Sequence, residues 1–106
     1  MPSVQPAVSE LPKRATQPGL IFFYSKSSGA CRRAEGFLAQ VLQRRRNHAT
    51  FKLYRVAQED RPDLVERFEV TAMPTLVVVD KRAVRGRLEK PRGCREIETF
   101  LAPWLK

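Results

Sequence analysis

Two uninterrupted runs of bulky and β-branched residues most constrain what this chain can fold into. They occupy residues 20–24, LIFFY, and residues 75–79, TLVVV. A strand with one face in water alternates apolar and polar side chains, whereas a run without alternation is typical of a strand buried on both faces. Two such strands in a chain of 106 residues predict one domain built on a central sheet that helices cover on both sides.

The segments around these runs complete an alternating order of strands and helices. Apolar residues recur at helical spacing from position 34 to position 42 and predict a helix over residues 29–46. The other predicted elements are a strand over 51–57, a short helix over 63–68, a strand over 75–80, a polar edge strand over 83–89 and a terminal helix over 96–105. The order βαβαββα predicts an α/β sandwich with a mixed sheet.

The first 18 residues differ in composition from the rest of the chain. They hold four of the eight prolines, Pro2, Pro6, Pro12 and Pro18, and show no sustained hydrophobic period. We therefore predict a flexible proline-rich arm over residues 1–18 and a folded domain over 19–106. The arm lacks the apolar core of a secretory signal, and no run approaches the roughly 18 apolar residues of a membrane span. The expected location is the cytoplasm, without membrane contact.

The chain is strongly basic. It holds 20 Lys and Arg against 11 Asp and Glu, which gives a formal net charge of +9. This charge makes nucleic acid or another polyanion a partner to consider, through the helix arginines Arg32, Arg33, Arg44, Arg45 and Arg46. A solvated basic face is the favoured interpretation, because no aromatic residues are interleaved with this charge to stack on bases.

Cysteine and histidine content limits the redox and metal chemistry of the chain. Cys31 and Cys94 are its two cysteines, and His48 is its one histidine. No zinc-binding spacing is present, so we expect no metal and no cofactor. In the cytoplasm a structural disulfide is disfavoured, and the sequence leaves open whether Cys31 and Cys94 can pair.

Two motifs lie at the ends of the buried strands. The SGAC motif, residues 28–31, opens the first predicted helix, and VTAMPTL, residues 70–76, runs into the second buried strand. Together with Gly93 before an amphipathic terminal helix, they resemble the thioredoxin-like family. The resemblance implies the thioredoxin fold, a three-layer α/β/α sandwich with a mixed four-stranded sheet. It also implies a cis peptide bond between Met73 and Pro74 that faces the redox motif.

The chain departs from the family pattern at its redox centre. The family motif is C-x-x-C, and Ser28 stands where its first, attacking cysteine would be. Phe22 stands where the family usually carries a buried acid, and Ser27 where a tryptophan is common. The short arm stands in place of the extra strand and helix with which thioredoxins open, as in the smaller glutaredoxins. Because a serine hydroxyl is not a thiolate nucleophile near neutral pH, self-contained disulfide reduction is disfavoured.

The first and last residues of the SGAC motif each have a structural and a chemical interpretation. Ser28 is a good helix N-cap, and this interpretation is favoured over a catalytic hydroxyl at the position of the lost nucleophile. Cys31 would lie in the first helical turn beside Arg32 and Arg33, where a thiolate is stabilised. Against this, the matching family cysteine is largely shielded, and a buried free cysteine behaves as a small hydrophobe. Whether the chain is an enzyme stays open.

The leading hypothesis is a docking or accessory module for a protein partner. In the family fold, the backbone before the cis-proline pairs with an extended segment, and this pairing needs no thiol at position 28. The predicted partner-binding residues are Tyr24, Gly29, Ala30, Arg32, Arg33, Met73, Pro74 and Thr75. Arginines at the rim, Arg92 and Arg95 among them, favour an acidic segment. The alternatives are a monothiol thiol-disulfide oxidoreductase that uses Cys31 with an external thiol such as glutathione, and a basic nucleic-acid or polyanion binder.

Overall fold

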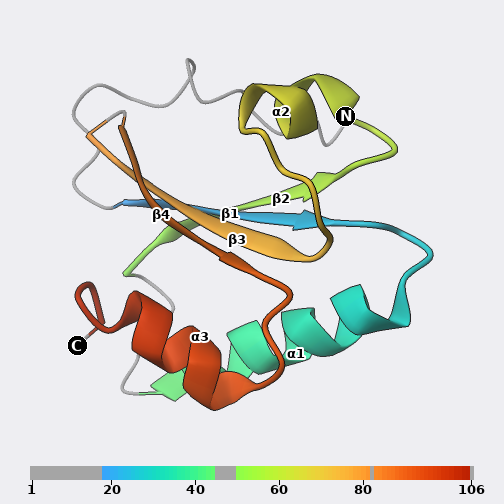
Figure 1. Ribbon diagram of the computed structural model, residues 1–106. Helices are drawn as coiled ribbons and strands as arrows, with labels where there is room; N and C mark the ends of the chain where they lie inside the picture. The colour runs from blue at the N-terminus through green and yellow to red at the C-terminus, as the bar shows by residue number, and fades with distance from the viewer. Residues whose placement is uncertain (1–17, 45–49, 82, 106) are drawn as a thin grey trace.

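Four strands and three helices follow one another along the described part of the chain. The computed structural model describes residues 18–44, 50–81 and 83–105 (Figure 1). The elements are β1 (Gly19–Tyr24), α1 (Gly29–Gln43), β2 (Lys52–Ala57), α2 (Pro62–Arg67), β3 (Thr75–Asp80), β4 (Ala83–Glu89) and α3 (Cys94–Leu101). Their order is the predicted βαβαββα.

The four strands form one mixed sheet in the order β2-β1-β3-β4. β1 pairs parallel to β2 and antiparallel to β3, and β3 pairs antiparallel to β4. The two continuous apolar runs are therefore the two central strands, in which every residue is buried except the last. This arrangement confirms the predicted mixed sheet, with the polar strand β4 at one edge and β2 at the other.

Alternate residues of the central strands face two separate hydrophobic cores. On one face, Phe22 and Leu76 pack against α1 and α3. On the other face, Phe23 and Val77 pack against α2. Figure 1 shows α1 and α3 below the sheet and α2 above it. The chain thus forms the three-layer α/β/α sandwich that the family resemblance implied.

Helix α1 is shorter than the sequence predicts. It ends at Gln43 instead of residue 46, because Arg44 takes an extended conformation (φ −68°, ψ 134°). The Arg44 guanidinium contacts the Glu98 carboxylate of α3 at 3.2 Å. This arginine therefore connects two helices, whereas Arg45 and Arg46 of the predicted polyanion surface lie outside the described residues.

Helix α3 both begins and ends earlier than the predicted range 96–105. Gly93 is its N-cap, and its last residue is Leu101. Pro103 follows closely, and a proline cannot continue the helical hydrogen bonds because it has no N–H. Beyond the helix, the Trp104 ring packs edge-on against Phe51, with ring centroids 6.2 Å apart.

Two expectations about the chain ends and location stay predictions. The predicted flexible arm over residues 1–18 lies outside the described residues except for Pro18. Of the helices in the described ranges, none has the length and apolar character needed to cross a membrane. Neither observation tests the predicted cytoplasmic location.

The sheet topology brings the two sequence motifs together. β1 and β3 are antiparallel, and Phe23 near the end of β1 lies opposite Thr75 at the start of β3. The SGAC motif follows β1, while Met73 and Pro74 immediately precede β3. Both motifs therefore lie at the same end of the sheet, beside the N-terminus of α1.

Candidate functional site

Ser28 begins α1 as its N-cap. Its backbone is extended (φ −97°, ψ 123°), and its hydroxyl oxygen accepts the Cys31 N–H at 3.2 Å. The first N–H groups of a helix have no partner within the helix, so such a cap stabilises it by about 1 kcal/mol relative to alanine. The structural interpretation of Ser28 is therefore confirmed: its hydroxyl is engaged in the fold.

The Cys31 thiol is buried beneath the start of α1. The residue is 2% exposed, and its Sγ accepts the Ser25 N–H at 3.3 Å. Both cysteines are free thiols, and the half-buried Cys94 places its Sγ 3.1 Å from Gln40 Oε1 on α1. A protein disulfide therefore cannot reach the Cys31 sulfur unless the SGAC motif moves.

A carboxylate from the segment that follows β2 holds the loop that carries Ser28. The Ser25 hydroxyl donates to Glu59 Oε2 at 2.7 Å, and the Lys26 N–H donates to Glu59 Oε1 at 3.2 Å. The Ser25 hydrogen bond, helped by backbone N–H groups, lowers the pKa of the Glu59 carboxyl. Alongside, the Lys26 ammonium pairs with Asp60 at 2.8 Å, and this contact raises the pKa of Lys26. The loop is thus held by two carboxylates of the segment that follows β2.

The cis-proline segment, residues 72–75, lies next to this loop. The Met73–Pro74 peptide bond is cis, the isomer that the resemblance implied. The Ala72 carbonyl accepts the Thr75 hydroxyl at 2.7 Å, and the Pro74 carbonyl accepts the Lys90 N–H at 2.7 Å. Between them, the half-buried Met73 makes no hydrogen bond with any residue of the described part of the chain, through either its N–H or its C=O.

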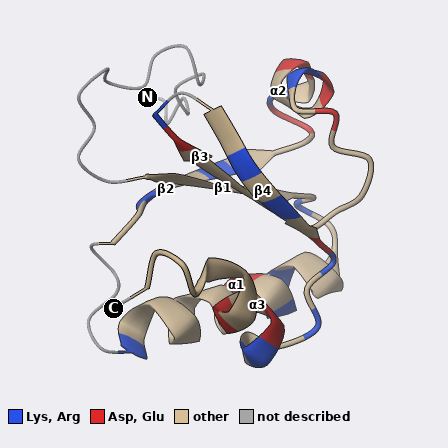
Figure 2. Ribbon diagram, turned by 60° about the vertical axis from the view of Figure 1, so that its left-hand side comes forward, with Lys and Arg blue, Asp and Glu red and all other residues tan. Residues whose placement is uncertain are grey.

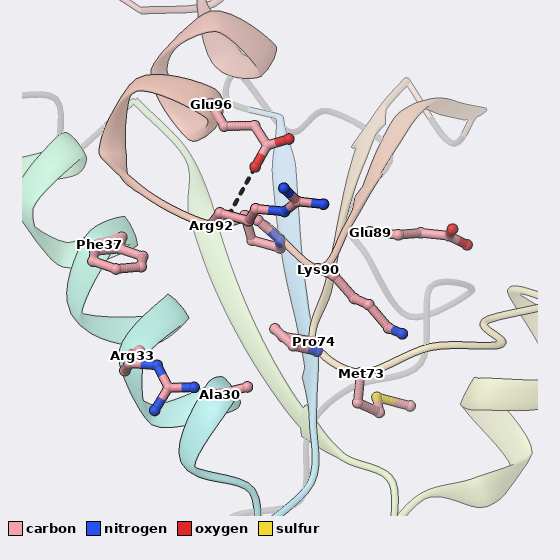
Figure 3. Close-up of a pocket in the computed structure, with 10 residues that line it drawn as sticks. Ala30, Arg33, Phe37, Met73, Pro74, Glu89, Lys90, Arg92 and Glu96 are labelled. Carbon is pink, nitrogen blue, oxygen red and sulfur yellow. Dashed lines mark hydrogen bonds between the residues drawn. The ribbon is translucent and has the colours of Figure 1, made fainter.

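A groove of about 790 Å³ runs beside this open backbone (Figure 3). Three segments line it: the first turns of α1, the cis-proline segment, and the stretch between β4 and α3. The lining residues are Ala30, Arg33, Phe37, Met73, Pro74, Glu89, Lys90, Pro91, Arg92 and Glu96. The structure thus brings together four of the predicted partner-binding residues: Ala30, Arg33, Met73 and Pro74.

The other predicted partner-binding residues lie off the groove. Tyr24 stacks on Phe22 with ring centroids 5.4 Å apart, and the Arg55 guanidinium from β2 covers its ring at 5.3 Å. Gly29 and Arg32 are exposed in the first turn of α1 without lining the groove. Thr75 is fully buried, and its hydroxyl holds the cis-proline segment through Ala72.

Basic side chains gather near the groove. Figure 2 shows Lys and Arg on α1 and in the segment between β4 and α3. Lys90 lines the groove without having been predicted, because nothing in the local sequence pattern places residue 90 beside residue 74. Within the described ranges, no three His, Cys, Asp or Glu side chains gather as a metal ion would require.

Comparison with known proteins places the chain in a family. The family model described as thioredoxin matches residues 7–103. The chain belongs to the thioredoxin family. The match begins at residue 7, within the arm predicted over residues 1–18. Comparison with curated proteins gives no significant match.

Solved structures of thioredoxins share the fold at low sequence identity. The reduced desulfothioredoxin of Desulfovibrio vulgaris Hildenborough is 19% identical, with a TM-score of 0.78 over 95% of this chain and 92% of its own. Trxlp from Edwardsiella tarda EIB202 is 17% identical, with a TM-score of 0.74 over 84% and 85%. Mitochondrial thioredoxin 3 of Saccharomyces cerevisiae, in its oxidised form, is 21% identical, with a TM-score of 0.72 over 86% and 82%. These similarities show a common fold.

Proposed function

We propose that this thioredoxin-family chain is a docking or accessory module that binds an extended segment of a protein partner along its cis-proline segment. The observation that carries the proposal is the open backbone of Met73, whose N–H and C=O lack hydrogen bonds within the described residues. Both flanking carbonyls, of Ala72 and Pro74, are already taken. An extended chain beside Met73 supplies one acceptor and one donor, as a strand added to a sheet does.

The groove supplies side-chain contacts for such a segment. The Met73 thioether is flexible and polarisable, and it adapts to apolar side chains of different shape. Phe37 of α1 and Pro91 add apolar lining on the other walls. Backbone pairing with adaptable apolar contacts supports binding of a segment, and neither contact involves a thiol.

The proposed module has no dithiol chemistry of its own. The SGAC motif contains one thiol, that of Cys31, a residue that is 2% exposed, and the serine at the first position of the motif is engaged as a helix cap. A dithiol exchange needs an exposed attacking thiolate and a resolving thiol, and only the resolving position is filled. We place the module in the cytoplasm, where free thiols such as Cys31 and Cys94 persist.

A peptide selection tests the docking function. Wild-type protein is used to select binders from a displayed library of random ten-residue peptides, and the best binder is then titrated against variants. Met73→Ala should weaken binding about fivefold, since a partly buried methionine contributes on the order of 1 kcal/mol. Leu53→Ala removes a comparable apolar side chain, 42% exposed on β2, and should leave the affinity unchanged. A library without binders, or binders sensitive to Leu53→Ala alone, would contradict the proposal.

A monothiol oxidoreductase is the second candidate, favoured by one observation. The Ser25 N–H donates to Cys31 Sγ at 3.3 Å, so the one sulfur of the motif is held in a defined position at the start of α1. Mass spectrometry after incubation with oxidised glutathione decides between the two candidates. The docking proposal predicts no adduct on Cys31, with the half-buried Cys94 as the internal comparison; a stoichiometric Cys31 adduct would favour the monothiol function.

A further inference from the structure

Three basic side chains line the groove without an ion-pair partner among the described residues. They are Arg33 from α1, and Lys90 and Arg92 from the stretch between β4 and α3. In contrast, Arg44, Arg55 and Arg61 each pair with a carboxylate elsewhere on the surface. The basic side chains that line the groove thus differ from these three arginines, because no described carboxylate pairs with them.

Two of these residues have local contacts near the open backbone of Met73. The Lys90 N–H donates to the Pro74 carbonyl at 2.7 Å, so Lys90 is attached to the cis-proline segment. The Arg33 guanidinium folds back over Gly29, since a Cβ built there would lie 3.6 Å from its Nη1. Figure 3 shows Pro74 between Arg33 and Lys90, with the end of the Lys90 side chain above Met73 in this view.

The two carboxylates of the groove do not offset these charges where a segment would lie. Glu96 Oε1 accepts the Arg92 N–H at 2.8 Å and is thereby held at the α3 end of the groove. The Glu89 carboxylate points away from Pro74 in Figure 3. The charges that flank Met73 and Pro74 are therefore those of Arg33 and Lys90.

We propose that the segment bound in the groove is acidic, with Asp or Glu side chains that pair with Arg33 and Lys90. This inference rests on the proposed docking function and adds the charge of the partner to it. A carboxylate beside an unpaired cation gains Coulomb energy, whereas a Lys or Arg in its place is repelled. The net charge of +9 also speeds the approach of an acidic partner.

Two double variants of equal charge test the inference. Arg33→Gln/Lys90→Gln removes one arginine and one lysine from the groove. Lys52→Gln/Arg85→Gln removes the same pair from exposed positions on β2 and β4 that do not line it. Each variant changes the formal net charge from +9 by two units, so the general field of the protein is weakened equally.

The measurement is the composition of ten-residue peptides selected from the random displayed library, followed by titration of the best binder. Peptides selected on the wild type should be enriched in Asp and Glu relative to the unselected library. The groove variant should bind the best peptide roughly 5- to 10-fold more weakly, as expected for two exposed ion pairs, and the control variant should lose less than twofold. The loss of affinity in the groove variant should be smaller at 0.5 M salt, because salt screens exposed ion pairs.

The outcomes separate this inference from the docking function beneath it. Binders that are neutral or basic overturn the acidic partner while docking stands. Equal losses in the two double variants also overturn it, because the attraction would then be general and not local to the groove. A library without binders overturns docking itself. A single-stranded RNA that displaces the best peptide and depends equally on Arg33 and Lys90 would assign the groove to a nucleic acid instead.

Discussion

The two segments that meet at the groove use their polar groups in opposite ways. In the loop from Ser25 to Cys31, hydroxyls and backbone N–H groups find partners inside the fold: Ser28 with Cys31, and Ser25 with Cys31 and Glu59. In the cis-proline segment the neighbours of Met73 are paired, and Met73 itself makes no hydrogen bond within the described residues. We call the loop from Ser25 to Cys31 the closed segment, because its polar groups are paired within the fold. We call the cis-proline segment the open segment, because the N–H and C=O of Met73 have no partner among the described residues.

The difference teaches that the groups available for redox exchange and those available for the proposed docking lie on different segments of the site. Redox exchange depends on a thiol at the start of α1, and here a helix cap occupies that place. Docking depends on the backbone before Pro74 and on the walls of the groove, which contain no cysteine. The proposed docking therefore needs none of the groups that dithiol exchange would use.

Returning a thiol to the closed segment should produce the largest effect. Ser28→Cys rebuilds the C-x-x-C motif at a helix N-terminus, where a thiolate is stabilised. We expect insulin disulfide reduction, followed by turbidity with dithiothreitol as reductant, to rise at least ~10-fold over wild type. Ser28→Cys/Cys31→Ser, which lacks the resolving thiol, is the control and should stay near the wild-type rate. A wild type as active as Ser28→Cys would show that Cys31 already performs the exchange.

A contact made from β4 should stabilise the end of α2, which precedes the cis-proline segment. The Arg87 guanidinium donates to the carbonyls of Phe68 at 2.7 Å and Glu69 at 3.1 Å, where α2 ends and the chain turns toward Met73. Arg87→Ala should lower the free energy of unfolding by about 1–2 kcal/mol, as measured by urea denaturation. Arg85→Ala, an exposed neighbour on the same strand, should change it by less than about 0.5 kcal/mol. Equal effects would mean that the contact does not hold this end of α2.

The closed segment should lose stability when its cap is removed. Ser28→Ala deletes the acceptor of the Cys31 N–H and should cost about 1 kcal/mol, or about 4 °C in Tm for a domain of this size. Ser27→Ala removes a hydroxyl from an exposed position of the same loop and should have a much smaller effect. If Ser28→Ala and Ser27→Ala have the same Tm, the hydroxyl of Ser28 is not a helix cap in solution.

The smallest effect should be a pH dependence at Glu59. Its pKa in the folded protein lies below the ordinary value of 4.5, so its contacts stabilise the fold above that pH and are lost as the pH falls through the folded pKa. The difference in Tm between wild type and Glu59→Gln should therefore be largest at neutral pH and shrink below pH 4.5. Ser25→Ala, which removes the main donor to this carboxylate, should narrow the difference. If the difference in Tm between wild type and Glu59→Gln is the same at pH 3 and pH 7, ionised Glu59 does not stabilise the fold through these contacts.

The fold was largely predictable because its signals are local or follow from the family resemblance. The two apolar runs became β1 and β3, the central strands, and the SGAC motif and Pro74 lie where the resemblance placed them. The site was less predictable. Glu59 reaches Ser25 across 34 positions, and Lys90 reaches Pro74 through the register of β4, so neither contact leaves a pattern in the nearby sequence. Tyr24, predicted to contact the partner, does not line the groove, and its ring contacts Phe22 and Arg55; its contact with a partner stays a prediction.

Amide hydrogen exchange at Cys31 and Met73, followed by NMR, tests the contrast between the two segments most directly. In the free protein the Cys31 amide, which donates to Ser28 Oγ, should exchange slowly, and the Met73 amide should exchange rapidly. Saturation with the best selected peptide should slow exchange at Met73 at least ~10-fold, because its N–H gains an acceptor, and leave Cys31 unchanged. A Met73 amide that is already protected in the free protein, or that is unaffected by bound peptide, would contradict the account.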